Sequence, residues 1–444
     1  MLNRLEVGKE MNNSGVVVVV GGGGREHALA RRLKHEPAVT EVHAWPGNAG
    51  MAKDGIICHG AGSVMDFAGI GALALATKAE MVVVGPEGPL VGGIANYFAE
   101  ENGLQDVMLV GPSKEGARLE GSKSFAKAFM QRHGIPTARY ESFDASQAEE
   151  ALRFLHTMRA PYVIKADGLA AGKGVAICQT LGEAEETLRS YFDGKFAEAS
   201  SRVVIEEFLS GIEVSVFIVT DGEGNYVLLP EAKDYKRLGE GDEGPNTGGM
   251  GSVSPVPFAD DSFMESVVTW IVKPTLDGLR KENIDYKGFI FFGLIRLEDG
   301  SPYVIEYNAR MGDPETQAVL PRLDESLFEI FRAMRGGALG QRKAKCTRDA
   351  CVSVTLAATG YPEAPRKGMR IDVDDANVPA NGHVIYSGVT SKEGGVLYVN
   401  GGRVISACGE GATIEAAAAC AYRTAEAVNF EGKYMRRDIT QDVI

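Results

Sequence analysis

Strand-like and helix-like patterns of apolar residues alternate through the first 120 residues of the chain. Residues 16–20 are all valine, and a continuous β-branched run of this kind is typical of a strand buried on both faces. A run of glycines then leads into a helical pattern from Glu26 to Lys34. Further strand patterns occupy residues 41–45, 80–84 and 106–110, with helical patterns between them. This alternation predicts a doubly wound, parallel α/β domain over residues 16–120.

Residues 121–335 mix both patterns around glycine-rich turns. Two strand patterns, Tyr162–Ala166 and Val175–Cys178, flank a loop with several glycines and predict a hairpin. Upstream, an amphipathic helix with Phe125, Phe129 and Met130 on one side follows Gly121. We expect an α+β domain here, with a lid subdomain over about residues 137–208.

The remaining segments have distinct patterns. Residues 345–444 predict a third, mostly β domain, in which we identify no chemistry beyond packing. Its strand patterns lie at residues 350–358, 383–387 and 396–399. A helix is expected from Thr413 to Asn429. The stretch Lys233–Ser254 is rich in glycine and poor in apolar residues, which favours a functional loop over core. Residues 1–15 lack apolar periodicity and are expected to be a disordered extension.

Composition narrows the class of protein. A chain of 444 residues exceeds what one hydrophobic core usually supports, so about three domains are expected. The apolar content of 44% suits a globular protein, and no apolar run is long enough to span a bilayer. A net charge of −14 disfavours a nucleic-acid surface. Six cysteines without C-x-x-C spacing predict free thiols in a reducing cytoplasm.

The clearest candidate for metal chemistry is the strand pattern that ends at Asn308. Residues two apart on a strand share a face, so Glu306 and Asn308 point the same way and offer oxygen atoms to one hard cation. Arg310 continues the same parity, and Asp313 and Glu315 follow it closely. The alternative is a solvated polar edge followed by a Gly-Asp-Pro turn.

The predicted hairpin carries candidate phosphate-binding residues. Its glycines let the backbone approach a phosphate, and its lysines bring positive charge; the residues concerned are Lys165, Gly172, Lys173 and Gly174, with Lys127 on the preceding helix. The G-x-x-x-G-K-G spacing differs from a Walker A loop, which leads into a helix rather than a strand. We therefore interpret it as a flexible lid over phosphates. An ordinary glycine-rich hairpin is the alternative, and it leaves the two lysines unexplained.

An acidic strand end downstream is a candidate adenosine site. Glu206 and Glu207 offer acceptors to an adenine amino group, Phe208 and Leu209 offer an apolar wall, and Glu213 can bind ribose hydroxyls. An acidic strand end that faces water is the alternative.

The glycine run before Arg25 invites a dinucleotide-binding interpretation, which the spacing excludes. In both registers of G-x-G-x-x-G, Glu26 or His27 takes the place of the third glycine, and no acid ends the second strand at Trp45. A nicotinamide-dependent oxidoreductase is therefore disfavoured. The predicted helix N-terminus can still hold a phosphate through its free N–H groups.

Taken in order, these blocks resemble the ATP-grasp superfamily of carboxylate–amine ligases. Five further motifs narrow the resemblance to the glycinamide ribonucleotide synthetase family, from about Val16 to Ile439: GGGREHALA, PGNAG, VGPEGPLV, GPNTGGMG and the tail FEG…RDI. The resemblance implies a ligase that uses ATP and Mg²⁺ or Mn²⁺ to join glycine to 5-phosphoribosylamine through glycyl phosphate. It implies small-molecule partners, neither nucleic acid nor membrane, and a monomer or homodimer in the cytoplasm.

The resemblance also implies roles for individual residues. Arg310, Lys165 and Asp313 would be catalytic, and Glu306 and Asn308 would hold the metal. The substrate-binding set would be Gly24, Arg25, Asn48, Gly50, Asp234, Lys236, Arg237, Asn246, Thr247, Gly248, Gly249, Arg310, Asp313 and Glu315.

Two positions depart from the family pattern. Arg296 stands where many ATP-grasp ligases carry a further acidic metal ligand, and Tyr235 replaces a histidine, so we assign Tyr235 no acid–base role. Two other functions share part of the pattern: another ATP-grasp ligase, such as a carboxylase acting on a purine precursor or on biotin, and a non-catalytic nucleotide-binding protein. The first would lack the terminal motifs, and the second would be expected to lose Glu306, Asn308, Lys127 or Lys165.

Overall fold

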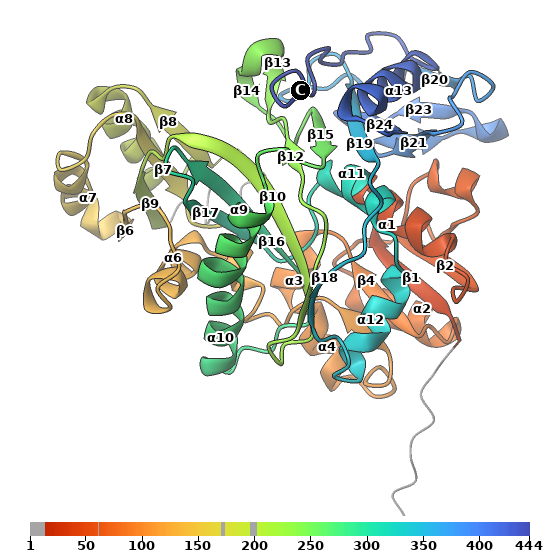
Figure 1. Ribbon diagram of the computed structural model, residues 1–444, viewed down its shortest axis with the longest axis horizontal. Helices are drawn as coiled ribbons and strands as arrows, with labels where there is room; N and C mark the ends of the chain where they lie inside the picture. Colours follow the sequence, from red (N-terminus) through yellow and green to blue (C-terminus); the bar gives the residue numbers. More distant parts are fainter. Residues whose placement is uncertain (1–13, 61, 170–173, 196–201) are drawn as a thin grey trace, which may run out of the picture.

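The structure is a computed structural model that describes residues 14–60, 62–169, 174–195 and 202–444. The expected extension at residues 1–15 lies almost entirely outside the described residues, as do Gly172 and Lys173. In Figure 1 the N-terminal strands, the long central strands and the C-terminal strands form three neighbouring bodies, and a small lid projects from the central one.

The N-terminal body is a parallel five-stranded sheet in the order β3-β2-β1-β4-β5. Its strands are β1 (Val16–Gly21), β2 (Glu41–Pro46), β3 (Ile57–Cys58), β4 (Met81–Val84) and β5 (Met108–Val110). Its helices are α1 (Gly24–Lys34), α2 (Phe67–Ala76), α3 (Glu87–Gly92), α4 (Ile94–Glu100) and α5 (Arg118–Gly121), with a 3-10 turn η1 (Met51–Asp54).

The valine run of β1 shows why this sheet lies in the interior. Val17 and Val19 pack into one apolar cluster with Leu29 of α1, whereas Val18 and Val20 pack into another with Ile70 of α2. A strand buried on both faces needs apolar side chains at every position, which is the pattern that the sequence carries.

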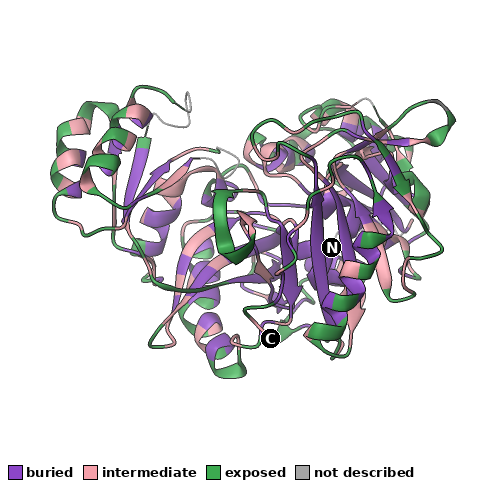
Figure 2. Ribbon diagram, turned by 90° about the horizontal axis from the view of Figure 1, so that it is seen from above, coloured by how far each residue is buried: buried purple, intermediate pink, exposed green. Residues whose placement is uncertain are grey.

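The central body is built on a sheet in the order β17-β16-β10-β11-β18. Its strands are β10 (Gly211–Thr220), β11 (Tyr226–Leu228), β16 (Gly288–Leu297), β17 (Pro302–Asn308) and β18 (Gln341–Lys343). One face packs on α9 (Asp261–Val267) and α10 (Lys273–Lys281), which a π-helical turn η5 (Val268–Val272) joins, and the other packs on α11 (Glu315–Arg322) and α12 (Leu327–Arg335). The strands of this sheet are mostly buried along their length, except the edge strand β18, which is exposed (Figure 2).

The lid is a smaller antiparallel sheet in the order β6-β9-β7-β8 with its own apolar core. Its elements are β6 (Tyr140–Asp144), η2 (Ala145–Gln147), α7 (Ala148–Leu155), β7 (Tyr162–Ala166), β8 (Val175–Cys178), α8 (Leu181–Phe192) and β9 (Arg202–Glu207). Helix α6 (Lys123–Arg132) precedes it. The predicted hairpin is present, since β7 and β8 pair antiparallel from Tyr162 opposite Cys178 to Lys165 opposite Val175.

The C-terminal body has two sheets, in the orders β12-β15-β19-β24-β21 and β22-β23-β20-β25. Its strands are β12 (Lys233–Asp234), β15 (Gly251–Ser254), β19 (Ala350–Ala357), β20 (Arg370–Val373), β21 (Gly382–Tyr386), β22 (Val389–Ser391), β23 (Leu397–Val399), β24 (Arg403–Gly411) and β25 (Val428–Asn429). Helix α13 (Ile414–Glu426) packs against β24 and β19. A short hairpin, β13 (Arg237–Gly239) and β14 (Glu243–Asn246), extends from it, with the turn η4 (Glu240–Asp242) at its tip.

Two expectations for this region are wrong in detail. Lys233–Ser254 is not a single loop, because β15 is wholly buried and pairs with β19. The last helix ends at Glu426 rather than Asn429, because Val428 and Asn429 pair with β20. The expected fold class is confirmed: a doubly wound α/β body, an α+β body and a small, mostly β body. No helix in the described part of the chain is long and apolar enough to cross a membrane.

Candidate active site

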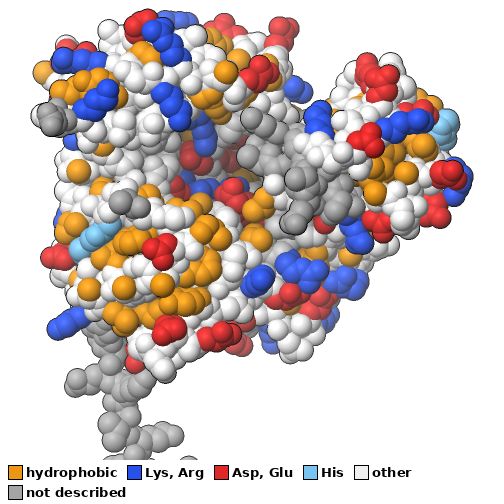
Figure 3. All heavy atoms as spheres, turned by 180° about the vertical axis from the view of Figure 1, so that it is seen from behind, with side chains coloured by type: hydrophobic (Ala, Val, Ile, Leu, Met, Phe, Trp, Pro, Cys, Tyr) orange, Lys and Arg blue, Asp and Glu red, His pale blue; other side chains and the backbone are white. Residues whose placement is uncertain are grey.

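A hollow lined by basic and acidic side chains opens between the three bodies (Figure 3). Along the central sheet, Glu306 and Asn308 of β17 lie opposite Gly293 and Phe291 of β16, while the intervening Tyr307 packs into the core on the other face. The parity expected for Glu306 and Asn308 therefore holds. An added Cβ at Gly293 would lie 3.1 Å from Cγ of Glu306, so glycine leaves room for that side chain.

Glu306 and Asn308 place a carboxylate and an amide on one face of β17, and oxygen atoms of these groups are the ligand types that a hard cation prefers. Asn308 is buried, and its amide nitrogen has no hydrogen-bond partner among the described residues. The negative charge of Glu306 favours the charged forms of Lys123, Lys236 and Arg310. Within the described ranges no three His, Cys, Asp or Glu side chains converge to hold a metal.

Arg296 does not occupy a metal-ligand position, and the interpretation of it as a replaced ligand is wrong. Side chains alternate along a strand, so Arg296 lies on the opposite face of β16 from Gly293. Its guanidinium donates to the carbonyl of Phe258 at 2.6 Å.

Two lysines and one glutamate form a buried cluster where α6 meets the lid. Lys127 Nζ and Lys165 Nζ lie 3.1 and 2.9 Å from Oε2 of Glu206. Burial, together with repulsion from Lys165, lowers the pKa of Lys127 to about 8 despite the attraction of Glu206. Burial raises the pKa of Glu206, but the two lysines outweigh it and the net shift is downward. The site is thus poised to accept further negative charge, because two cations share one carboxylate.

Lys123 is a site residue that the sequence interpretation did not single out. Its Nζ donates to the carbonyl of Gly168 at 3.1 Å, at the base of the glycine loop. Burial lowers the pKa of Lys123, attraction to Glu306 partly offsets this shift, and repulsion from Lys165 adds to it. The Lys123 ammonium therefore interacts with both Glu306 and Lys165. Its spacing of four from Lys127 was the available signal, because residues four apart share a helix face.

The expected adenosine residues lie where the lid joins the central sheet. Phe208 is 42% exposed and Leu209 is half-buried, so an apolar surface is accessible there. Glu206 already binds lysines through Oε2, while its buried Oε1 has no partner among the described residues. Glu207 accepts from the backbone N–H of Arg139 at 2.8 Å. Glu213 accepts from Lys236 Nζ at 2.5 Å, so a ribose would share this carboxylate with a lysine.

Acidic side chains lie close to Lys236 and Arg310. Burial raises the pKa of Glu315 to about 7, and Asp234 adds repulsion. The pKa of Asp234 is also raised by burial. The pKa of Lys236 is raised well above its ordinary value, because Asp234, Glu213 and Glu306 outweigh its burial. The Ser215 hydroxyl donates to Glu315 at 3.1 Å and orients that carboxyl.

Arg310 is held by two carboxylates from the N-terminal side of the chain. Its Nη2 lies 2.7 Å from Oε1 of Glu120, and its Nε lies 3.3 Å from Oε2 of Glu87. Its Nη1 donates to the carbonyl of Met311 at 3.1 Å. Neither glutamate was singled out from the sequence, because no local pattern links them to Arg310.

The C-terminal body contacts one of the predicted site residues, Asp313. Arg403 of β24 lies 3.2 Å from Oδ2 of Asp313 and donates to the Asp313 carbonyl at 2.6 Å. It also donates to the carbonyl of Gly248. Burial raises the pKa of Asp313, but Arg403 and Arg25 outweigh it, and the net shift is downward.

The polar loop after Asp234 is partly committed to its own structure. Arg237 donates to the carbonyl of Gly244 at 2.8 Å, inside the β13–β14 hairpin. Thr247 Oγ1 donates to the Lys236 carbonyl at 2.8 Å and accepts from the N–H of Gly249 at 2.9 Å. Asn246 is exposed. Lys236 is therefore the member of this set whose charge lies within the acidic cluster.

The N-terminal loops meet the C-terminal body instead of facing open solvent. Gly24 N–H donates to the Ser387 hydroxyl at 3.0 Å, and Arg25 N–H donates to Asp313 at 3.4 Å. The Asn48 amide donates to Tyr386 O at 3.0 Å, and its oxygen accepts from Gly50 N–H at 2.8 Å. Protein acceptors thus occupy the backbone N–H groups of Gly24 and Arg25 at the start of α1.

Comparison with known proteins decides the family. Sequence models of phosphoribosylglycinamide synthetase match the chain in three parts: the N domain at residues 16–120, the ATP-grasp (A) domain at 121–316 and the C domain at 351–442. The chain belongs to the phosphoribosylglycinamide synthetase family. It is 43% identical over 417 residues to phosphoribosylamine–glycine ligase of Pasteurella multocida, covering 94% of this chain and 95% of that protein. The corresponding protein of Pseudomonas aeruginosa is 42% identical over the same shares of both chains.

Solved structures agree with this assignment. The crystal structure of phosphoribosylamine–glycine ligase from Thermotoga maritima superimposes with a TM-score of 0.80 at 38% identity, covering 95% of this chain and 99% of that chain. The biotin carboxylase domain of Hydrogenobacter thermophilus 2-oxoglutarate carboxylase, in complex with MgADP and bicarbonate, has a TM-score of 0.73 at 18% identity, covering 95% of this chain and 91% of that chain. At that identity the second similarity shows the ATP-grasp fold alone.

Proposed function

We propose that the chain is an ATP-dependent ligase that joins glycine to 5-phosphoribosylamine, forming glycinamide ribonucleotide, ADP and phosphate in purine biosynthesis. The observation that carries this proposal is the identity of 43% to a phosphoribosylamine–glycine ligase over nearly the full length of both chains. The described residues support it, because Lys165, Glu306, Asn308 and Arg310 are all present, and the charge of Glu306 acts on Arg310.

The reaction must overcome the poor reactivity of a carboxylate toward amines. In the first step, a carboxylate oxygen of glycine attacks the γ-phosphorus of ATP, and the bond to the β–γ bridging oxygen breaks to give glycyl phosphate and ADP. In the second, the amine of 5-phosphoribosylamine attacks the acyl carbon, the amine loses a proton and phosphate leaves. No side chain needs to act as a covalent nucleophile, so the protein contributes positioning and charge stabilisation.

On the nucleotide side, the lysines would neutralise phosphate charge. Lys127 and Lys165 share a single carboxylate, and Lys123 lies at the base of the glycine loop, so ammonium groups converge where the triphosphate would lie. Gly174, with Gly172 and Lys173 outside the described residues, would form the lid over the phosphates. Glu206, Glu207, Phe208, Leu209 and Glu213 would bind the adenosine. Mg²⁺ or Mn²⁺ held by Glu306 and Asn308 would draw charge from the phosphate oxygens.

On the acceptor side, Arg310 would stabilise the transferring phosphoryl group, and Asp313 and Glu315 would orient the glycine ammonium. Lys236, with Asp234 beside it, would bind a carboxylate or phosphate oxygen. The loops that hold Gly24, Arg25, Asn48, Gly50, Arg237 and Asn246 to Gly249 would enclose 5-phosphoribosylamine. We expect the enzyme to act in the cytoplasm as a monomer or homodimer.

The decisive experiment measures ADP release by the purified protein with ATP and Mg²⁺. Glycine and freshly made 5-phosphoribosylamine are added separately and together. Release only with both would support the ligase and its two substrates. Release with bicarbonate instead would retain the ATP-grasp chemistry and refute the substrate assignment.

A further inference from the structure

Arg310 is the cation that we propose for the transferring phosphoryl group, and its own segment provides only one backbone contact in the described part of the chain, from Nη1 to the Met311 carbonyl at 3.1 Å. A guanidinium on four rotatable side-chain bonds must be oriented before it can stabilise a transition state without reorganisation. Near Arg310, the orienting groups come from distant parts of the chain, Glu87 of α3 and Glu120 of α5.

Glu120 makes the stronger of these contacts. Its side chain is only 5% exposed, its Oε1 lies 2.7 Å from Arg310 Nη2, and its Oε2 accepts from the N–H of Ala309 at 2.8 Å. One carboxylate therefore binds both the guanidinium and the backbone next to it. Two contacts on adjacent residues fix the direction in which the arginine side chain leaves the strand.

Glu87 adds a second carboxylate from another element. It is the first residue of α3, its side chain is 32% exposed, and it lies 3.3 Å from Arg310 Nε. Arg25 donates to the Met311 carbonyl at 3.3 Å, the same acceptor that Arg310 Nη1 uses at 3.1 Å. The Met311 carbonyl therefore accepts from two arginines, and one of them, Arg310, is also paired with Glu87.

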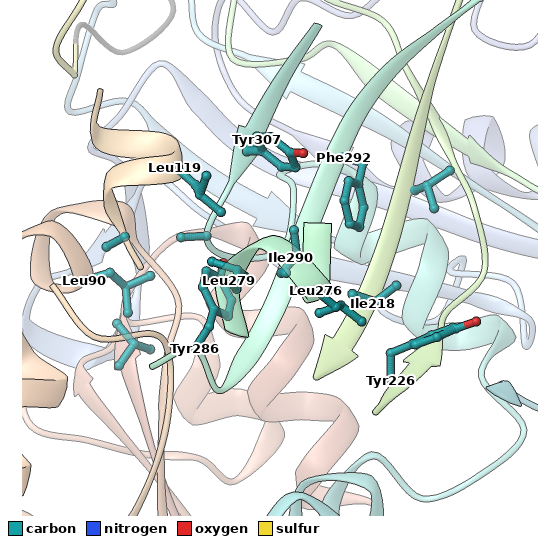
Figure 4. Close-up of a cluster of buried hydrophobic side chains, with 14 of the residues drawn as sticks. Leu90, Leu119, Ile218, Tyr226, Leu276, Leu279, Tyr286, Ile290, Phe292 and Tyr307 are labelled. Atoms are coloured by element: carbon teal, nitrogen blue, oxygen red, sulfur yellow. The ribbon is translucent and has the colours of Figure 1, made fainter. Parts of the chain in front are cut away.

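The two glutamates are held rigidly because their helices share a core with the sheet that bears the site. Leu90 of α3 and Leu119 of α5 pack in one apolar cluster with Ile290 of β16 and Tyr307 of β17. Figure 4 shows Leu90 and Leu119 at the left of this cluster, with Tyr307 and Phe292 at its top. Tyr307 is three residues before Arg310, so the packing that fixes α3 and α5 also fixes the strand that leads to the arginine.

We propose that Glu120, assisted by Glu87, is a positioning residue that orients Arg310 for phosphoryl transfer, so that the N-terminal domain takes part in the ATP-dependent step. The proposal rests on the proposed ligase function. Glu120 touches neither substrate nor metal in this scheme and acts only through Arg310. Its removal should therefore lower kcat far more than it alters the KM for ATP.

The first experiment compares Glu120→Gln with a matched control, Glu80→Gln. Glu80 is also buried, with a side chain 4% exposed, and pairs with Arg332 at 2.7 and 2.9 Å. It precedes β4, whereas Glu87 follows β4, so the two lie at opposite ends of the sheet. Both variants should lose thermal stability. Only Glu120→Gln should lower kcat by about tenfold or more with the KM for ATP within about threefold of wild type, while Glu80→Gln keeps kcat within about twofold. Equal kcat for the two variants would overturn the proposal.

A second experiment tests whether Glu120 acts through Arg310. In an Arg310→Lys background, Glu120→Gln should lower kcat by no more than about twofold, because the group it orients is already gone. A further fall as large as that in wild type would overturn the proposal. A crystal structure of Glu120→Gln should show the Arg310 guanidinium displaced, and an unmoved guanidinium would also overturn it.

Folding and substrate identity are kept separate from this test. If Glu120→Gln does not fold, Glu87→Gln replaces it, since that side chain is partly exposed, and a fall in kcat of about threefold or more is expected. The kcat of each variant is divided by the kcat of wild type, and both are measured with the acid and the amine that cause wild type to release ADP. If wild type releases ADP only with another acid and amine, the proposed substrates are refuted. If the kcat of the variant equals that of wild type, the role of Glu120 is refuted.

Discussion

Arg403 and Asp313 form an ion pair that joins the C-terminal body to the loop before α11, with Nη2 3.2 Å from Oδ2. The arginine also binds the carbonyl oxygens of Asp313 and Gly248, so one guanidinium connects the loop before α11 to the loop after β14. Both loops belong to the proposed acceptor side. In the proposed scheme, the C-terminal body would therefore hold the acceptor-side loops in place.

Arg403→Ala should impair the acceptor side selectively. We expect kcat/KM for 5-phosphoribosylamine and glycine to fall by about tenfold or more, with the KM for ATP within about threefold, because the lysines and Glu306 are unaffected. Steady-state ADP release with each substrate varied in turn measures this. Arg366→Ala is the control, since Arg366 pairs with Glu431 in the same body but its side chain is 61% exposed. A rise in the KM for ATP alone would contradict the expectation.

Glu306→Ala should abolish turnover and leave the fold intact. The carboxylate is committed to no ion pair in the described part of the chain, so its loss leaves no buried cation unpaired. We expect ADP release to fall by about a hundredfold or more, with a melting temperature within about 2 °C of wild type. Chelation of divalent cations should abolish ADP release by wild type in the same assay. Glu298→Ala, in the exposed turn before β17, is the control, and near-normal Mg²⁺-dependent activity in Glu306→Ala would refute the metal site.

The sequence predicted those parts of the fold and site that depend on local pattern. The valine strand, the β7–β8 hairpin and the shared face of Glu306 and Asn308 all follow from periodicity over a few residues. The wholly buried strand β15 escaped this reasoning. Its sequence, Gly-Ser-Val-Ser, has low hydropathy, and its serines are buried because Ser252 donates to Pro314 O at 2.7 Å and Ser254 donates to Glu231 O.

The missed site residues share one physical property, which is that their partners are distant in sequence. Glu120 is 190 positions from Arg310 (310 − 120), and Arg403 is 90 positions from Asp313. No periodicity relates such positions, so only the packing of the bodies brings them together. Tyr235 belongs to the same class, because its partners lie in the last residues of the chain.

Tyr235→Phe should weaken the fold and spare catalysis. The Tyr235 hydroxyl donates to Asp442 at 2.6 Å and accepts from the N–H of Thr440 at 3.0 Å, in a buried position. Removal of one hydroxyl leaves a buried N–H unsatisfied, so we expect the free energy of unfolding to fall by about 1–3 kcal/mol. Urea unfolding measures this change, and kcat should stay within about twofold of wild type. A large loss of kcat with unchanged stability would instead assign the hydroxyl a chemical role. Tyr398→Phe, on β23, is the control.

The pH dependence of stability should report on Glu315. Burial, with repulsion from Asp234, raises the pKa of this carboxyl from 4.5 to about 7 in the folded protein. The folded state therefore binds the proton more tightly than the unfolded chain does. This group's contribution to stability is complete below about pH 4.5 and is lost as the pH rises through about 7.

Glu315→Gln should remove that pH dependence, because the amide keeps the shape of the protonated carboxyl and does not ionise. Between about pH 5 and 8, the free energy of unfolding of Glu315→Gln should rise relative to wild type by on the order of 1 kcal/mol or more. Urea unfolding at intervals across this range measures the difference. Glu329→Gln is the control, since Glu329 lies on α12 with a side chain 53% exposed. Parallel curves for wild type and Glu315→Gln would show that Glu315 ionises normally in the folded protein, and its carboxylate would then face the substrate permanently charged.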